Sequence, residues 1–315
     1  MKWYFVLIII IIGLIIVLSI AFPFILSYFL CTIHMKRTKK EKWGRVCSLP
    51  SNQEQLDMWN KGLDYIKKYQ DKIEEVDIYS DNLHLFGEYV NVGSDKCVIL
   101  LGGRCECLYY AYYYAKPYLE NNINVLVVDQ RAHGKSDGIY STVGIKESKD
   151  MICWINYLKD NKYIKKVMMH GTCIGAATII HTAADDNCPE ILDRIIVDGL
   201  FRTYYETFKY HMIELNRPTK PALDLTFKWY KLLAKIDAKN NGPIYQIDKV
   251  KIPIMFISGD KDKFVLHEMT NDLFSKCGSN DKECYFLPEG GHSHLRINQE
   301  DNYDKLVIDF INMEF

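Results

Sequence analysis

A cysteine between two glycines is the first feature of this sequence that could do chemistry. Cys173 lies between Gly171 and Gly175, directly after the apolar segment 166–170 and before an alanine-rich segment that should open a helix. A tight turn from strand to helix presents a nucleophile at its tip, and the glycines let the two elements approach closely. The helix N-terminus favours the thiolate, the attacking form of cysteine. A small buried cysteine is the alternative interpretation.

An acid and a base follow downstream, each in a loop after a further strand-like segment. Asp262 lies in the first of these loops and His292 in the second. Imidazole titrates near pH 6.5, so His292 could take a proton from Cys173 and later return it to a leaving group. Asp262 would fix the tautomer of the imidazole. His294 and Asp260 are the competing base and acid, and loop position favours His292 and Asp262.

Five short apolar runs rich in β-branched residues define the expected sheet. Segments long enough for helices separate them, which predicts parallel strands joined by crossover helices. The runs lie at 97–101, 124–129, 166–170, 194–198 and 253–258. A helix is expected over 51–70, and an antiparallel hairpin of 75–80 with 83–90 at the sheet edge.

The segment 201–247 separates two expected strands and has no strand of its own. Connections of this length are uncommon without a function. We interpret it as a helical lid over the active site, with a long ordinary crossover as the equal alternative.

The N-terminal segment 1–33 is a separate unit. It contains no acidic or basic residue between Trp3 and Ile33 and is dominated by Ile, Leu, Val and Phe. At about 1.5 Å per residue, such a helix exceeds the roughly 30 Å hydrocarbon core of a bilayer. A cleavable signal peptide is the alternative, but its apolar region spans only about 7 to 15 residues. The sequence therefore predicts an uncleaved transmembrane anchor.

The basic segment 34–50 is expected to be a linker between the anchor and a domain over 51–315. The positive-inside rule places that domain in the cytoplasm, because the basic residues after the anchor outnumber Lys2 before it. These residues are Lys36, Arg37, Lys39, Lys40 and Lys42. The 10 cysteines form no regular disulfide framework, which agrees with a reducing compartment.

Composition limits the possible functions. With 315 residues, of which 48% are hydrophobic and 25% charged, the chain can bury the core of one large α/β domain. The formal net charge of -1 leaves no broad basic surface. Nucleic-acid binding is therefore not expected, and an ordinary globular enzyme fits better.

Together these motifs resemble the α/β-hydrolase superfamily, particularly its bacterial membrane-anchored serine-hydrolase-like proteins. The resemblance covers about residues 75–313. The chain order Cys173, Asp262, His292 is the order of that family, and residues 129–136 match its D-x-R-x-H-G-x-S segment. That match makes His133 a structural residue that braces the turn after its strand. The fold implied is a mostly parallel twisted sheet flanked by helices, with a short helical lid and an N-terminal transmembrane helix.

The resemblance also implies an oxyanion hole, formed by the backbone N–H groups of Arg104 and Ile174. Two departures from the family pattern stand out. Gly102 and Gly103 occupy the place where the family usually has His-Gly, and cysteine replaces the usual serine. Cysteine at this position also occurs in dienelactone hydrolases, polyhydroxyalkanoate synthases and bile-acid-CoA:amino-acid acyltransferases, so the replacement is compatible with activity.

The predicted reaction is hydrolysis of an ester, thioester or amide bond of a small acyl substrate through a covalent acyl-enzyme. No metal or organic cofactor is needed. Two alternatives stay open. The same triad could transfer the acyl group to an amine or alcohol, or the protein could be a catalytically silent α/β-hydrolase-like binding protein.

Overall fold

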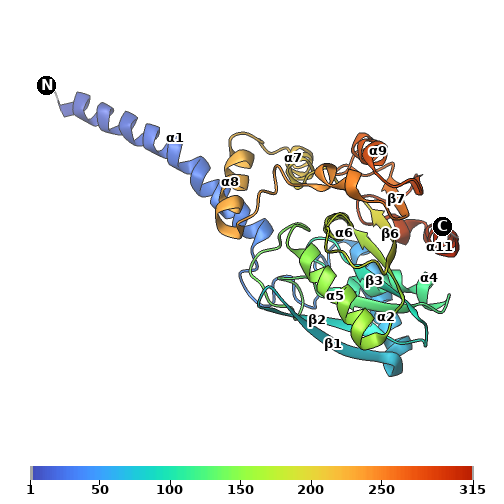
Figure 1. Cartoon of the computed structure of the whole chain (residues 1–315). Helices are drawn as coiled ribbons and strands as arrows, with labels where there is room; N and C mark the ends of the chain where they lie inside the picture. The colour runs from blue at the N-terminus through green and yellow to red at the C-terminus, as the bar shows by residue number, and fades with distance from the viewer. Residues whose placement is uncertain (1–2, 314–315) are drawn as a thin grey trace.

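A single sheet of eight strands organises the chain (Figure 1). The computed structural model describes residues 3–313. The strand order is β1-β2-β4-β3-β5-β6-β7-β8, with β2 antiparallel to both of its neighbours and all other pairs parallel. The strands are β1 Ile73–Ser80, β2 Leu83–Val90, β3 Lys96–Leu101, β4 Asn124–Val128, β5 Lys166–Thr172, β6 Leu192–Asp198, β7 Ile254–Gly259 and β8 Lys282–Leu287. The mostly parallel sheet and its antiparallel edge hairpin are confirmed.

Helices cover both faces of the sheet (Figure 1). Alternate residues of β3 show why its apolar run is continuous: Ile99 and Leu101 pack into one hydrophobic cluster, Val98 and Leu100 into the other. The first cluster includes residues of α5 Glu147–Lys162, α6 Ile174–Ala183 and α9 His267–Lys276. The second includes residues of α2 Gln53–Tyr69, α3 Leu108–Ala111, α4 Lys116–Leu119 and α11 Glu300–Asn312. A strand buried on both faces needs no polar alternation.

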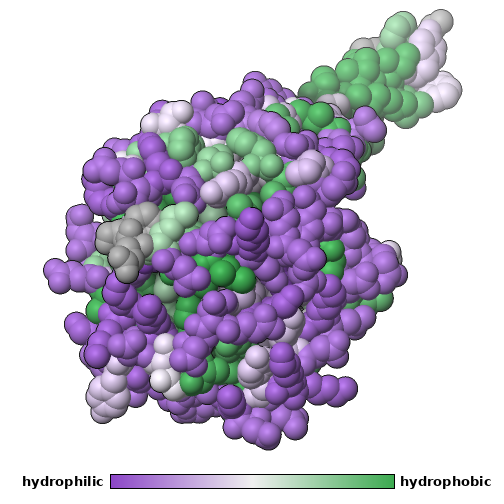
Figure 2. Space-filling model, turned by 90° about the vertical axis from the view of Figure 1, so that its right-hand side faces the viewer, coloured by the Kyte–Doolittle hydropathy of each residue, from purple (hydrophilic) through white to green (hydrophobic). Residues whose placement is uncertain are grey.

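The N-terminal helix α1, Trp3–Met35, is 33 residues long and contains Pro23. Its most apolar window is entirely unburied, and it is long and apolar enough to cross a membrane. Figure 2 shows this mostly hydrophobic helix projecting from a largely hydrophilic surface. The first two residues of the predicted anchor, and the last two of the predicted domain, lie outside the described residues.

The last turns of α1 pack against the domain. Ser27, Cys31 and Met35 are buried there. The contact is made by α8, Ala222–Ala234, whose Thr226 hydroxyl donates to the carbonyl of Ser27 at 3.3 Å. The adjacent α7, Tyr204–Glu214, and α8 make up most of the segment predicted as a lid. This segment has no strand, as expected, and its role as a lid stays a prediction.

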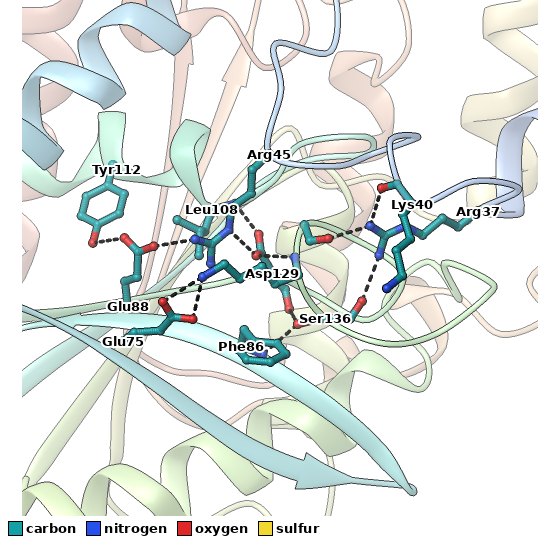
Figure 3. Close-up of polar contacts among 12 residues, drawn as sticks. Arg37, Lys40, Arg45, Glu75, Phe86, Glu88, Leu108, Tyr112, Asp129 and Ser136 are labelled. Atoms are coloured by element: carbon teal, nitrogen blue, oxygen red, sulfur yellow. Dashed lines mark hydrogen bonds and ion pairs between the residues drawn. The ribbon is translucent and has the colours of Figure 1, made fainter.

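The basic segment after α1 is fixed to the domain rather than extended (Figure 3). Arg37 donates to the carbonyl oxygens of Ser136 at 2.9 Å and Gly134 at 2.6 Å. The Trp43 ring stacks on the buried ring of His133 with 5.1 Å between centroids. The predicted linker therefore holds the end of α1 close to the loop after β4.

Asp129, the first residue after β4, accepts several hydrogen bonds in this region (Figure 3). Its carboxylate accepts hydrogen bonds from Arg45 Nε, Leu108 N and Lys135 N, each at 2.9 Å. Arg45 also donates to Glu88 at 2.7 Å, so one guanidinium joins two carboxylates from neighbouring strands. Removing Asp129 leaves the backbone N–H groups of Leu108 and Lys135 without this acceptor and Arg45 with one carboxylate in place of two, which is costly.

We therefore expect Asp129→Ala to lower the free energy of unfolding by about 3 to 5 kcal/mol. The matched control is Glu75→Ala, which removes a carboxylate that pairs with Lys135 at 2.7 Å but is half exposed. That change should cost less than about 1 kcal/mol. Urea unfolding of the full chain in detergent measures both. Equal effects would contradict a bracing role for Asp129.

Candidate active site

Cys173 occupies the turn between β5 and α6 in a backbone conformation that side chains rarely adopt, with φ 51° and ψ -110°. A Cβ added to Gly171 would lie 2.7 Å from the carbonyl carbon of Gly175, and one added to Gly175 would lie 2.6 Å from the carbonyl oxygen of Leu101. Larger residues are excluded at both positions for this reason. A strained backbone of this kind persists only where its surroundings enforce it.

His292 and Asp262 form a hydrogen-bonded pair beside Cys173. Nδ1 of His292 lies 2.7 Å from Oδ2 of Asp262. The other carboxylate oxygen of Asp262 accepts from the backbone N–H groups of Phe264 at 2.8 Å and Val265 at 2.9 Å. The carboxylate is therefore held in one orientation, and it holds the imidazole in turn. His292 and Cys173 line the same cavity.

The competing residues named from the sequence have other partners. Asp260 is exposed and pairs with His267 at 2.9 Å. His294 is bound to Gln55 Oε1 at 2.8 Å and lies 3.3 Å from a carboxylate oxygen of Glu54. Neither joins the cluster of Cys173, Asp262 and His292.

Charge around His292 favours its protonated form. Burial alone lowers the pKa of His292, but the adjacent negative charges of Asp262 and of the Cys173 thiolate, with their hydrogen bonds, raise it well above its ordinary value. Burial raises the pKa of Asp262, yet the charge and hydrogen bond of His292 bring it below its ordinary value. The arrangement suits an imidazolium held beside a fixed carboxylate.

A cavity of about 280 Å³ opens above this cluster. Its walls come from the loop after β3, from α7 and from the loops that carry Asp262 and His292. Tyr204, Phe208 and Phe264 supply aromatic surface. An apolar substrate portion therefore has a place to lie close to Cys173.

The predicted oxyanion donors lie at the same end of the sheet. Ile174 is the first residue of α6, where backbone N–H groups have no acceptor within the helix. Arg104 follows Gly103, whose Cβ position would be 3.5 Å from the Cβ of Cys173. Arg104 lines the cavity with Cys173.

Glu106 is a site residue that the sequence analysis missed. It is buried, and its carboxylate accepts from Gly103 N at 2.6 Å and from Gln55 Nε2 at 2.8 Å. It thereby shapes the loop that carries Arg104. The one available signal was an acidic residue between two cysteines, which does not by itself predict burial.

Asp198 is a second residue that was missed. It ends β6, is fully buried, and accepts from the Tyr303 hydroxyl at 2.9 Å. Burial raises the pKa of Asp198 to about 7, although the hydrogen bond from Tyr303 and the charge of His292 lower it. An acidic residue ending an apolar strand-like run was its signal in the sequence.

Comparisons with known proteins agree with the fold. No family model matches the sequence. The uncharacterized protein YqkD of Bacillus subtilis is 27% identical over 201 residues, which are 63% of this chain and 65% of that protein. An uncharacterized membrane protein of Saccharomyces cerevisiae is 24% identical over 196 residues, 62% of each chain. The match thus spans less than two thirds of the length of these relatives.

Among solved structures, the Pyrococcus furiosus esterase Pf2001 superposes with a TM-score of 0.65 at 24% sequence identity, over 78% of this chain and 92% of that one. At this identity the likeness concerns the fold alone. The strand order, the helices on both faces and this superposition together show that the chain has the α/β-hydrolase fold.

Proposed function

We propose that this protein is a hydrolase that cleaves an ester, thioester or amide bond through a covalent acyl-enzyme on Cys173. His292 acts as base and acid, and Asp262 orients it. The observation that carries this proposal is that His292, hydrogen-bonded to Asp262, lines one cavity together with Cys173.

The reaction begins with attack of the Cys173 thiolate on the substrate carbonyl carbon. A carbon–sulfur bond forms, and the carbonyl electrons move to oxygen, where the backbone N–H groups of Arg104 and Ile174 stabilise the oxyanion. The imidazolium of His292 gives its proton to the leaving group as the scissile bond breaks. Water then attacks the thioester, with His292 as general base, and the released acid restores Cys173.

We also propose that α1 anchors the protein in a membrane with the catalytic domain on the cytoplasmic side. The membrane relative in yeast supports the association. Two of the basic residues after α1 also make contacts within the protein. Arg37 binds the loop after β4, and Lys42 Nζ donates to the carbonyl oxygen of Ile33 at 2.7 Å. A hydrogen bond to a carbonyl oxygen leaves the charge of each cation in place, so all five basic residues favour the cytoplasmic side.

The first test of the mechanism is thiol alkylation followed by mass spectrometry. We expect Cys173 to react with iodoacetamide at least about tenfold faster than Cys97. Cys97 is fully buried, and the thiolate is the form of cysteine that reacts. His292→Ala should slow Cys173 and leave Cys97 unchanged, because the imidazolium stabilises the thiolate. Cys173→Ala should lower hydrolysis of short acyl esters about 10³-fold or more. If Cys173 reacts no faster than Cys97 and Cys173→Ala keeps every activity, the binding-protein alternative replaces the hydrolase.

The second test is the pH dependence of kcat/KM. The reactive pair needs protonated His292, whose pKa is raised, so activity should persist above pH 6.5 and fall only as the pH rises through that higher value. Asp262→Asn removes one of the charges that raise it. The alkaline limb should therefore move about one to three pH units lower.

The control for this shift is Asp260→Asn. It removes a carboxylate only two residues away, which pairs instead with His267. The alkaline limb should stay in place in this variant. A limb that moves equally in both variants would exclude Asp262 as the partner of His292.

A further inference from the structure

Arg104 brings a positive charge to the cavity but pairs with no carboxylate among the described residues. It lies in the loop after β3, behind Gly102 and Gly103, and it is partly exposed among the residues that line the cavity with Cys173 and His292. Its guanidinium donates to Cys105 Sγ at 3.2 Å. Within residues 3–313 the guanidinium forms no ion pair.

Two buried arginines show how this chain compensates such a charge elsewhere. Arg131 donates twice to Asp150, at 2.7 Å each, and Arg296 donates twice to Asp304, at 2.6 and 2.7 Å. A cation withdrawn from water without such a partner is destabilising. Arg104 is therefore an exception that needs a reason.

Glu106, the nearest acidic residue in the sequence, acts on Arg104 through its charge but forms no hydrogen bond with it. Glu106 directs its two carboxylate oxygens to Gly103 N and Gln55 Nε2. On the α7 side, burial and the charge of Arg104 lower the pKa of His211, so this residue supplies no counter-charge. The cavity thus presents a guanidinium to whatever enters it.

We propose that the Arg104 side chain binds an anionic group, a carboxylate or a phosphate, carried by the substrate close to its scissile carbonyl. This inference rests on the proposed hydrolase function and narrows its substrate class. A guanidinium fork matches both oxyanions with two parallel hydrogen bonds. The aromatic walls accept the apolar remainder, so a half-ester of a dicarboxylic acid or an acyl ester of a phosphorylated alcohol fits the cavity.

The two roles proposed for Arg104 are separable, because the oxyanion donor is the backbone N–H and the anion site is the side chain. Arg104→Gln keeps the first and removes the charge of the second. Arg217→Gln is the matched control, since Arg217 is exposed and does not line the cavity.

The test compares two reagents that differ in charge, the anion iodoacetate and the neutral iodoacetamide, on the full chain in detergent. At each cysteine we take the ratio of the alkylation rate with iodoacetate to the rate with iodoacetamide. This ratio should be about tenfold larger at Cys173 than at Cys153, which lies on α5. Arg104→Gln should reduce the ratio at Cys173 to that at Cys153, and Arg217→Gln should leave it unchanged. If Arg104 only stabilised the thiolate, both reagents would slow equally in Arg104→Gln, and this unchanged ratio would overturn the proposal.

A second measurement does not depend on a reactive thiol. Calorimetry in the Cys173→Ala background should detect glutarate or inorganic phosphate, bound about tenfold more weakly after Arg104→Gln. The stronger ligand tells which oxyanion the site prefers. The anion site is overturned if neither glutarate nor phosphate binds, or if Arg104→Gln leaves the affinity for both ligands unchanged. If Cys173 is unreactive but anion binding depends on Arg104, the proposed hydrolase function is refuted while the anion site is supported.

Discussion

The close approach of β5, α6 and β3 is the constraint on which the site depends. Gly171 and Gly175 permit this approach, and a Cβ at either position would collide with the backbone. The approach forces Cys173 into its unusual backbone conformation at the carboxyl end of the sheet. The loops after β3, β7 and β8 meet at the same end, so Arg104, Asp262 and His292 reach Cys173 without any long insertion.

Electrostatic pairing then decides what the assembled residues can do. Asp262 is fixed by two backbone N–H groups and one imidazole nitrogen, so its charge stays where His292 needs it. The imidazolium is stabilised on both sides, by Asp262 and by Cys173. Arg104 adds positive charge to the wall of the cavity in which a substrate would bind. The proposed nucleophile and the proposed ligand are both anions, and these positive charges would stabilise each of them.

The N-terminal helix α1 is connected to this space through the packing of α7 and α8. α8 contacts the end of α1, and α7 supplies Tyr204, Phe208 and His211 to the cavity wall. His34, near the end of α1, lies edge-on to Phe208 with 5.0 Å between ring centroids. The docked basic segment adds a second attachment through Arg37. A cavity wall backed by α1 would hold the site at a fixed place relative to a bilayer.

The sequence predicted the elements whose signals are local. Apolar β-branched runs gave the strands, and the glycines around Cys173 gave the turn. Contacts between distant charged residues could not be predicted, because they have no periodicity: Arg45 meets Asp129 across 84 positions, and Gln55 meets Glu106 across 51. For the same reason the docked segment 34–50 was expected to be a linker, and the buried carboxyl of Asp198 was not anticipated.

The central claim is that Cys173 forms a covalent acyl-enzyme, and mass spectrometry of the protein quenched during turnover of an activated ester measures this directly. The account predicts one acyl group on the peptide that contains Cys173, with the adduct decaying as water attacks. His292→Ala should diminish its formation. The absence of any acyl group on Cys173 while the ester is being hydrolysed would contradict the account.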